Sequence, residues 1–124
     1  LKKIGSISID RDKVRRENLG FYDKIISVSK NTKRPILIFP QATRTAVDDK
    51  QPFKKGVSKI YEKLNFICVP VALNSGNVWP KSGKLNSNKT ITISILKHIP
   101  VGLNADDFLN KLEYELYSEL ESIR

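Results

Sequence analysis

Apolar residues follow two different periods along this chain, and each period predicts one kind of element. Apolar positions three and four residues apart predict helices over about residues 13–29, 55–64 and 104–120. In the last of these, Asn104 can cap the first turn, and the apolar stripe consists of Phe108, Leu112, Leu116 and Leu120. Short apolar runs between turn-forming residues predict strands over about 4–9, 35–39, 66–73 and 90–97.

The predicted strands differ in how much of each should be buried. The continuous apolar run at 35–39 is typical of a strand buried on both faces. Residues 90–97 alternate, which predicts a half-buried strand with its isoleucines inward and its hydroxyl residues outward, namely Ile91, Ile93 and Ile95 against Thr92 and Ser94. Pro70 interrupts the 66–73 run and cannot donate to a ladder, so we expect a sheet edge or a bulge there.

Strands alternate with helices through most of the chain, which indicates an α/β fold with a mostly parallel sheet and flanking helices. The 124 residues suffice for one domain, and no internal repeat or low-complexity tract divides residues 1–124. Methionine is absent and the chain begins with Leu1, so we expect this α/β unit to be incomplete at its N-terminus. No apolar run approaches the roughly 20 residues that a membrane-spanning helix needs.

The charge balance narrows the class of partner. Twenty-two Lys and Arg residues against thirteen Asp and Glu give a formal net charge of +9. Such a surface suits a polyanion, and the candidates are a nucleic acid, an anionic membrane surface and a phosphorylated substrate. No known nucleic-acid motif and no aromatic residues interleaved with the basic ones appear, so we expect no nucleic-acid partner.

Candidate chemistry gathers where the predicted strands end, which is where ligands bind in parallel α/β sheets. Arg11 follows the first strand, and Thr43 and Arg44 follow the second. Two guanidinium groups beside a hydroxyl would bind a phosphate, although an arginine after a strand more often forms a surface ion pair. No metal-binding motif is present.

Three residues of types often found in active sites or at membrane surfaces are predicted to have no catalytic or lipid-binding role. His98 is the only histidine and has no acidic neighbour in sequence, so we expect it to be exposed or structural. Cys68, the only cysteine, lies in an apolar run and should act as a small, inert apolar residue. Trp79 suits a loop anchor better than a lipid contact.

Five segments, in order, resemble conserved blocks of the glycerolipid acyltransferase family. Residues 5–11 resemble the second block, G-x-I-F-I-D-R, and include Asp10 and Arg11. Residues 38–44 resemble the third block, F-P-E-G-T-R, through Phe39, Pro40, Gln41, Ala42, Thr43 and Arg44. Residues 53–56, with Lys55 and Gly56, match the F-K-K-G that follows, and residues 69–73, with Val69 and Pro70, match the fourth block, V-P-V-A-L. Residues 99–102 resemble a late P-I-P-x-G segment.

Two features depart from the family pattern. Gln41 stands where glutamate is usual, which keeps the acceptor oxygen and loses the charge, and Ala42 replaces a glycine, which suits the site only if its φ is not positive. The first family block, H-x-x-x-x-D, does not occur, because His98 is followed at the fifth position by Leu103. The resemblance therefore implies no catalytic residue within these 124 positions and a catalytic histidine upstream of them.

The resemblance implies acyl transfer from acyl-CoA or an acylated acyl carrier protein to the sn-2 hydroxyl of lysophosphatidate, giving phosphatidate in phospholipid synthesis. Arg11, Arg44 and Thr43 would bind the substrate phosphate, and no metal or other cofactor is required. The resemblance, together with the positive charge, implies the cytoplasmic face of an anionic membrane, reached peripherally or through a preceding anchor. The alternative is a non-catalytic basic module that binds phosphate, an anionic membrane or nucleic acid.

Overall fold

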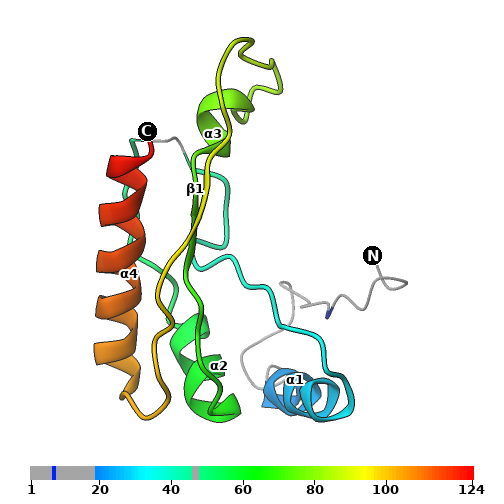
Figure 1. Ribbon diagram of the computed structural model, residues 1–124. Helices are drawn as coiled ribbons and strands as arrows, with labels where there is room; N and C mark the ends of the chain where they lie inside the picture. The colour runs from blue at the N-terminus through cyan, green and yellow to red at the C-terminus, as the bar shows by residue number, and fades with distance from the viewer. Residues whose placement is uncertain (1–6, 8–18, 46–47) are drawn as a thin grey trace. The chain divides into compact units, whose positions relative to one another are not determined.

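Two compact units, residues 1–37 and 38–124, make up the computed structural model. It describes residue 7, residues 19–45 and residues 48–124, and each unit is treated by itself (Figure 1). The strand predicted at 4–9 and the start of the helix predicted at 13–29 lie outside the described residues. In the first unit, α1 spans Leu19–Asn31 and confirms the rest of that helix, with Ile25 buried on its inner face.

Helices α2 (Gly56–Leu64) and α4 (Ala105–Ser122) form most of the core of the second unit, as their apolar spacing predicts. Asn104 caps α4, because its side-chain oxygen accepts from the backbone N–H of Asp107 at 2.9 Å. The rings of Tyr61 and Phe108 stack across the two helices with centroids 3.8 Å apart. The buried cluster consists of Phe53, Val57, Tyr61, Ala72, Ile99, Phe108, Leu112 and Leu116.

Strands β1 (Val71–Leu73) and β2 (Ile93–Ile95) pair in antiparallel fashion, with Ala72 opposite Ser94. A further bridge joins Cys68 to Ile99. Between this bridge and the ladder, two residues on one side oppose three on the other, so the pairing carries a bulge beside Pro70. The irregular pairing opposite Pro70 agrees with the prediction of an edge or a bulge there, and the extra residue lies on the 96–98 side.

The face of the sheet that packs against α4 is the opposite of the predicted one. Ser94 points toward α4 and donates to Glu119 at 2.6 Å, and Ala72 is buried in the core. Ile93 and Ile95 lie on the other face and are 65% and 73% exposed, so the prediction that the isoleucines point inward is wrong. Small residues let the helix approach the sheet closely, which is why Ala72 and Ser94 occupy the covered face.

The predicted mostly parallel sheet is not confirmed. Residues 35–39 form neither helix nor strand in the described structure, and Leu37 and Phe39 are 78% and 70% exposed, so the buried strand predicted there is wrong. A strand buried on both faces needs a hydrogen-bonded neighbour, and the sheet formed by the described residues contains β1 and β2 alone. The described part is compatible with a piece of an α/β fold, because α4 packs on a small two-stranded sheet and α2 packs on α4 (Figure 1).

Candidate substrate-phosphate site

The segment resembling the third family block forms a tight turn that is joined to the segment resembling F-K-K-G. The N–H of Ala42 donates to the carbonyl of Phe39 at 3.0 Å, which closes the turn. The N–H of Lys54 donates to the carbonyl of Pro40 at 2.9 Å. Two segments recognised separately in the sequence therefore lie side by side in the structure.

Gln41 fastens this turn to α4. Its side-chain amide lies 3.3 Å from the hydroxyl of Thr45 and 3.3 Å from the hydroxyl of Tyr117. Tyr117 in turn donates to the carbonyl of Gln51 at 2.5 Å, and its ring packs against Phe53 with centroids 5.2 Å apart. Because the Tyr117 proton is used on Gln51, the residue at position 41 has to supply a donor, and an amide does so where a carboxylate would not.

Further contacts hold the loop after the turn to the same helix. The N–H of Phe53 donates to Glu113 of α4 at 2.8 Å. Near the C-terminus, Lys50 pairs with Glu121, and Asp48 pairs with Arg124 at 3.0 Å. These two ion pairs are exposed, so each contributes at most about 1 kcal/mol. The loop is therefore positioned mainly by its partly buried hydrogen bonds and by the Phe53 ring.

Ala42 adopts a left-handed backbone conformation with φ of +57°. The family pattern has glycine here, and the expectation that alanine suits the site only without a positive φ is not met. A Cβ in this region costs roughly 1–2 kcal/mol, so the turn keeps its shape against local strain. The turn hydrogen bond between Ala42 and Phe39 and the Gln41 contacts hold it in place.

Thr43 and Arg44 follow the turn, and both are exposed. One guanidinium nitrogen of Arg44 lies 3.5 Å from the carbonyl of Pro80, which belongs to the loop after α3 (Ser75–Val78). A guanidinium carries five N–H donors in one plane, so this contact orients the group while leaving capacity for a phosphate. The exposed hydroxyl of Thr43 stands next to it in the chain.

The other predicted site residues fall into three groups. Asp10 and Arg11 lie outside the described residues, so the convergence of Arg11 with Arg44 stays a prediction. Lys55 is exposed, and its carbonyl accepts from Ser58 at the start of α2; Gly56 has no atom within 4 Å of where a Cβ would stand, so packing in the described part does not require glycine. Val69 is 47% exposed, and Pro70 is buried with its carbonyl bound to Leu96.

The structure agrees with the predictions made for His98 and Cys68, but not with the prediction made for Trp79. His98 is exposed, as predicted. Cys68 is half-buried, and burial first, then the charge of Glu115, raises the pKa of its thiol, in line with an inert role. Trp79 is 60% exposed, so it is no buried loop anchor. Among the described residues, no group of three or more His, Cys, Asp or Glu side chains could hold a metal ion.

Sequence reasoning missed the supports of the loop. Tyr117 lies one position beyond Leu116 of the apolar stripe, and Glu113 one position beyond Leu112. An aromatic residue with a polar tip beside an apolar stripe is a weak signal of such a support. The role of the Pro80 carbonyl could not be predicted, because every residue has a backbone carbonyl and the sequence does not show which one accepts a hydrogen bond.

A threonine and an arginine exposed on a loop that a helix braces define a segment suited to binding a phosphate group. The model of a protein family described as Acyltransferase matches residues 1–74. The chain therefore belongs to the acyltransferase family.

Two curated relatives carry the same name. Over 127 residues the chain is 30% identical to the 1-acyl-sn-glycerol-3-phosphate acyltransferase of Saccharomyces cerevisiae, which covers 96% of the chain and 41% of that protein. Over 60 residues it is 33% identical to the enzyme of that name from Pseudomonas aeruginosa, covering 48% of the chain and 23% of that protein. The chain thus spans less than half the length of either relative. No solved structure matches it significantly.

Proposed function

We propose that this chain supplies the acceptor-binding part of an enzyme that acylates the sn-2 hydroxyl of lysophosphatidate. Family membership and the names of the two relatives support the reaction class and the acceptor. The observation that carries the proposal is the exposed Thr43–Arg44 pair on a loop fixed to α4 through Gln41 and Tyr117. A fixed loop holds a phosphate at a defined place and so places the hydroxyl for attack.

The proposed reaction is an acyl transfer that needs a base. A base removes the proton of the sn-2 hydroxyl as its oxygen attacks the thioester carbonyl of acyl-CoA or acylated carrier protein. The new ester C–O bond forms, the C–S bond breaks, and the proton passes to the departing thiolate. His98 is exposed and outside any H-x-x-x-x-D pattern, so we propose that the base lies outside these 124 residues, on their N-terminal side.

In this proposal, the guanidinium of Arg44 and the hydroxyl of Thr43 bind oxygen atoms of the substrate phosphate. Arg11 supplies a second guanidinium to the same phosphate. The bidentate geometry of arginine suits a phosphate monoester better than a neutral lipid headgroup. The acceptor should therefore be a lysolipid with a terminal phosphate. The competing proposal, a basic module without catalytic activity, keeps the phosphate site and lacks turnover.

Arg44→Ala in the full-length enzyme tests the assignment. We expect kcat/KM for lysophosphatidate to fall about 10–100-fold through a higher KM, the loss expected for a charge-assisted contact of about 1.5–3 kcal/mol. The KM for the acyl donor should change little, and Arg44→Lys should recover part of the loss. Lys59→Ala removes one exposed charge from α2 and is the matched control.

Three outcomes decide between the readings. Unaltered kinetics in a folded Arg44→Ala variant would remove the phosphate role of this loop. Equal losses with lysophosphatidate and with an uncharged monoacylglycerol would show that Arg44 does not recognise phosphate. A full-length protein that binds lysophosphatidate without any acyl transfer would favour the non-catalytic module.

A further inference from the structure

The loop that follows α3 (Ser75–Val78) presents apolar side chains to solvent. Trp79 is 60% exposed and Leu85 is 65% exposed, and every residue from 81 to 90 is exposed. A tryptophan and a leucine this exposed on one short loop need an explanation, because single exposed apolar residues are ordinary whereas such a pair beside several charges is not. We call residues 79–90 the projecting loop.

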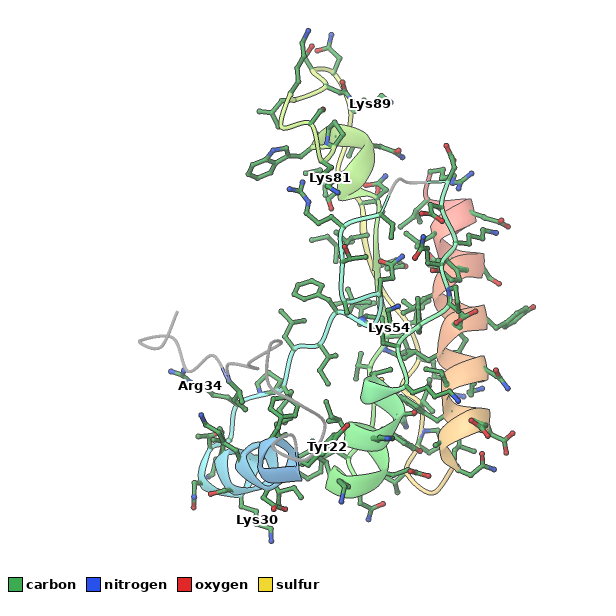
Figure 2. All side chains as sticks on the ribbon, turned by 180° about the vertical axis from the view of Figure 1, so that it is seen from behind. Tyr22, Lys30, Arg34, Lys54, Lys81 and Lys89 are labelled. Carbon is green, nitrogen blue, oxygen red and sulfur yellow. The ribbon has the colours of Figure 1, made fainter. Side chains whose placement is uncertain are left out.

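The charges of the projecting loop have one sign. It contains Lys81, Lys84 and Lys89, and no Asp or Glu occurs anywhere between Glu62 and Asp106. Six of the nine acidic residues of the second unit lie on α4, namely Asp106, Asp107, Glu113, Glu115, Glu119 and Glu121. Figure 2 shows Lys81 and Lys89 on the part that projects, away from Lys54 on the main body. The projecting loop therefore carries three positive charges around Trp79 and Leu85, with no acidic residue near them in the sequence.

The base of the projecting loop is firmly built. Asn74 joins three elements: its side-chain nitrogen donates to the carbonyl of Ile123 at 2.7 Å, and its oxygen accepts from the N–H of Thr92 at 2.8 Å. Gly83 closes a turn onto the carbonyl of Pro80 at 2.9 Å with φ of +82°. The N–H of Asn86 donates to the carbonyl of Val78 at 2.8 Å. The loop thus extends beyond the end of α4 as an ordered projection (Figure 1).

We infer that the projecting loop docks on an anionic phospholipid bilayer. Lysines near such a surface are attracted by its negative potential, and tryptophan favours the interface between headgroups and acyl chains. Leu85, between Lys84 and Asn86, would enter the apolar edge of the bilayer while the lysines stay at headgroup level. A bilayer would thus bind both the lysines and the exposed apolar side chains of the loop.

Other partners fit less of the loop. A second copy paired loop to loop would bring three lysines against three lysines, which repel, and the acidic residues of α4 on a second copy would leave Trp79 and Leu85 without an apolar partner. A single-stranded nucleic acid would attract the lysines and could stack on Trp79, but it would leave the exposed Leu85 without a partner. Charge complementarity together with the apolar tip therefore selects the bilayer.

The position of Arg44 links this surface to the proposed acceptor site. Its guanidinium donates to the carbonyl of Pro80 at the base of the projecting loop. A loop docked on the bilayer would hold that guanidinium near the headgroups, where the phosphate of a lysolipid lies. This last step rests on the proposed function, whereas the docking surface does not.

Trp79 is the only tryptophan of the chain, so its fluorescence reports on this surface alone. The 124-residue chain is mixed with phosphatidylcholine vesicles with or without phosphatidylglycerol. With phosphatidylglycerol present, we expect a blue shift of the emission, quenching by acyl chains brominated near the headgroup, and loss of binding as salt rises. Neutral vesicles should bind far more weakly.

Variants separate the loop from the general charge of the chain. Lys81→Gln, Lys84→Gln and Lys89→Gln together should weaken the partition into anionic vesicles roughly 100-fold at low salt, about fivefold for each lysine. The same three-charge change at the exposed Lys24, Lys30 and Lys33 should weaken it several-fold at most. Leu85→Ser should weaken binding about tenfold. Tyr114→Ser, at a 74% exposed position of α4, is its control and should leave binding unchanged.

The inference is overturned if vesicles sediment with the chain while the Trp79 emission stays unchanged, or if both lysine sets matter equally. It is also overturned if neutral vesicles bind as well as anionic ones, or if the chain binds RNA at physiological salt and ignores vesicles. Arg44→Ala removes one positive charge at the base of the loop, so vesicle binding should weaken about fivefold at most, far less than with the three lysine changes, even if lysophosphatidate turnover is lost. A failure of the loop proposal is thereby distinguished from a failure of the acceptor site.

Discussion

The side-chain amide of Gln41 reaches the hydroxyl of Tyr117 across 3.3 Å, although the two residues are 76 positions apart in the sequence. The hydroxyl of Tyr117 donates its own proton to the carbonyl of Gln51. A tyrosine with a committed proton can accept from an amide, but it cannot also donate to a carboxylate. The glutamine found where the family has glutamate is therefore matched to a residue on α4.

Tyr117→Phe removes both hydrogen bonds and keeps the ring that packs on Phe53. We expect the free energy of unfolding to fall by about 1–2 kcal/mol, because one partly buried and one exposed hydrogen bond are lost and water replaces them in part. Urea unfolding followed by circular dichroism measures it. Tyr114→Phe, on the same helix and 74% exposed, should change the free energy by less than about 0.5 kcal/mol.

A double-mutant cycle with Gln41→Ala isolates the Gln41–Tyr117 contact. If the contact exists, the double variant should lose about 0.5–1 kcal/mol less than the sum of the single losses. Additive losses would mean that the two residues act independently, and the account of Gln41 as a donor would fail.

Ala42 offers a test of backbone strain. With φ of +57°, Ala42→Gly should relieve the clash of Cβ with the backbone, at the cost of a more flexible unfolded chain. We expect a net gain of about 0.5–1 kcal/mol in the free energy of unfolding. The same substitution at Ala105, in the first turn of α4, should destabilise, because glycine there gains nothing and loses helix propensity. A loss at position 42 would indicate that the positive φ is not adopted.

Local patterns predicted those elements whose stability depends on residues close in sequence. The apolar stripe of α4 and the cap at Asn104 lie within a few turns of each other, and both are as predicted. The irregular pairing opposite Pro70 agrees with what the missing N–H of that one residue predicts. Each of these features is decided by chemistry that a short segment contains.

Features that depend on distant partners could not be predicted. Alternation at 90–97 correctly indicates two faces, but only the position of α4 decides that the face with Ser94 is covered. The site is similar: the third-block residues were recognisable, whereas their support by Tyr117 and the contact of Arg44 with Pro80 depend on the tertiary fold. The strand at 35–39 failed because apolar residues in a row need a neighbouring strand to bury them.

Because α4 covers the face of the sheet opposite to the predicted one, substitutions at two isoleucines should differ strongly in their effect on the free energy of unfolding. Ile93→Thr, at a 65% exposed position, should change the free energy of unfolding by less than about 0.5 kcal/mol. Ile99→Thr, at a fully buried position of the core, should cost about 2–4 kcal/mol, since it removes apolar contacts and buries a hydroxyl. Thermal and urea unfolding of both variants measure the difference. A cost at Ile93 as large as that at Ile99 would mean that the isoleucine face is covered in solution.

Cys68 gives a test based on pH. Burial, and then the negative charge of Glu115, disfavour the thiolate and raise the pKa of this thiol. Only the thiolate reacts with iodoacetamide, so the folded chain at pH 8 should be alkylated at least about tenfold more slowly than the chain in urea. The rate for the folded chain should still be rising with pH above the ordinary thiol pKa of about 8.5.

The raised pKa of the Cys68 thiol also makes the stability of the folded chain depend on pH. A thiol whose pKa is raised by folding stabilises the folded state below its ordinary pKa, and this contribution is lost as pH rises through the folded value. Glu115→Gln removes the charge while keeping the size, so it should lower the thiol pKa and speed alkylation of the folded chain at pH 8.5. Glu62→Gln, on the exposed side of α2, is the control and should leave the rate unchanged. Equal alkylation rates for the folded and unfolded chains would show that Cys68 is accessible and ionises normally, contrary to its place beside Ile99 in the sheet.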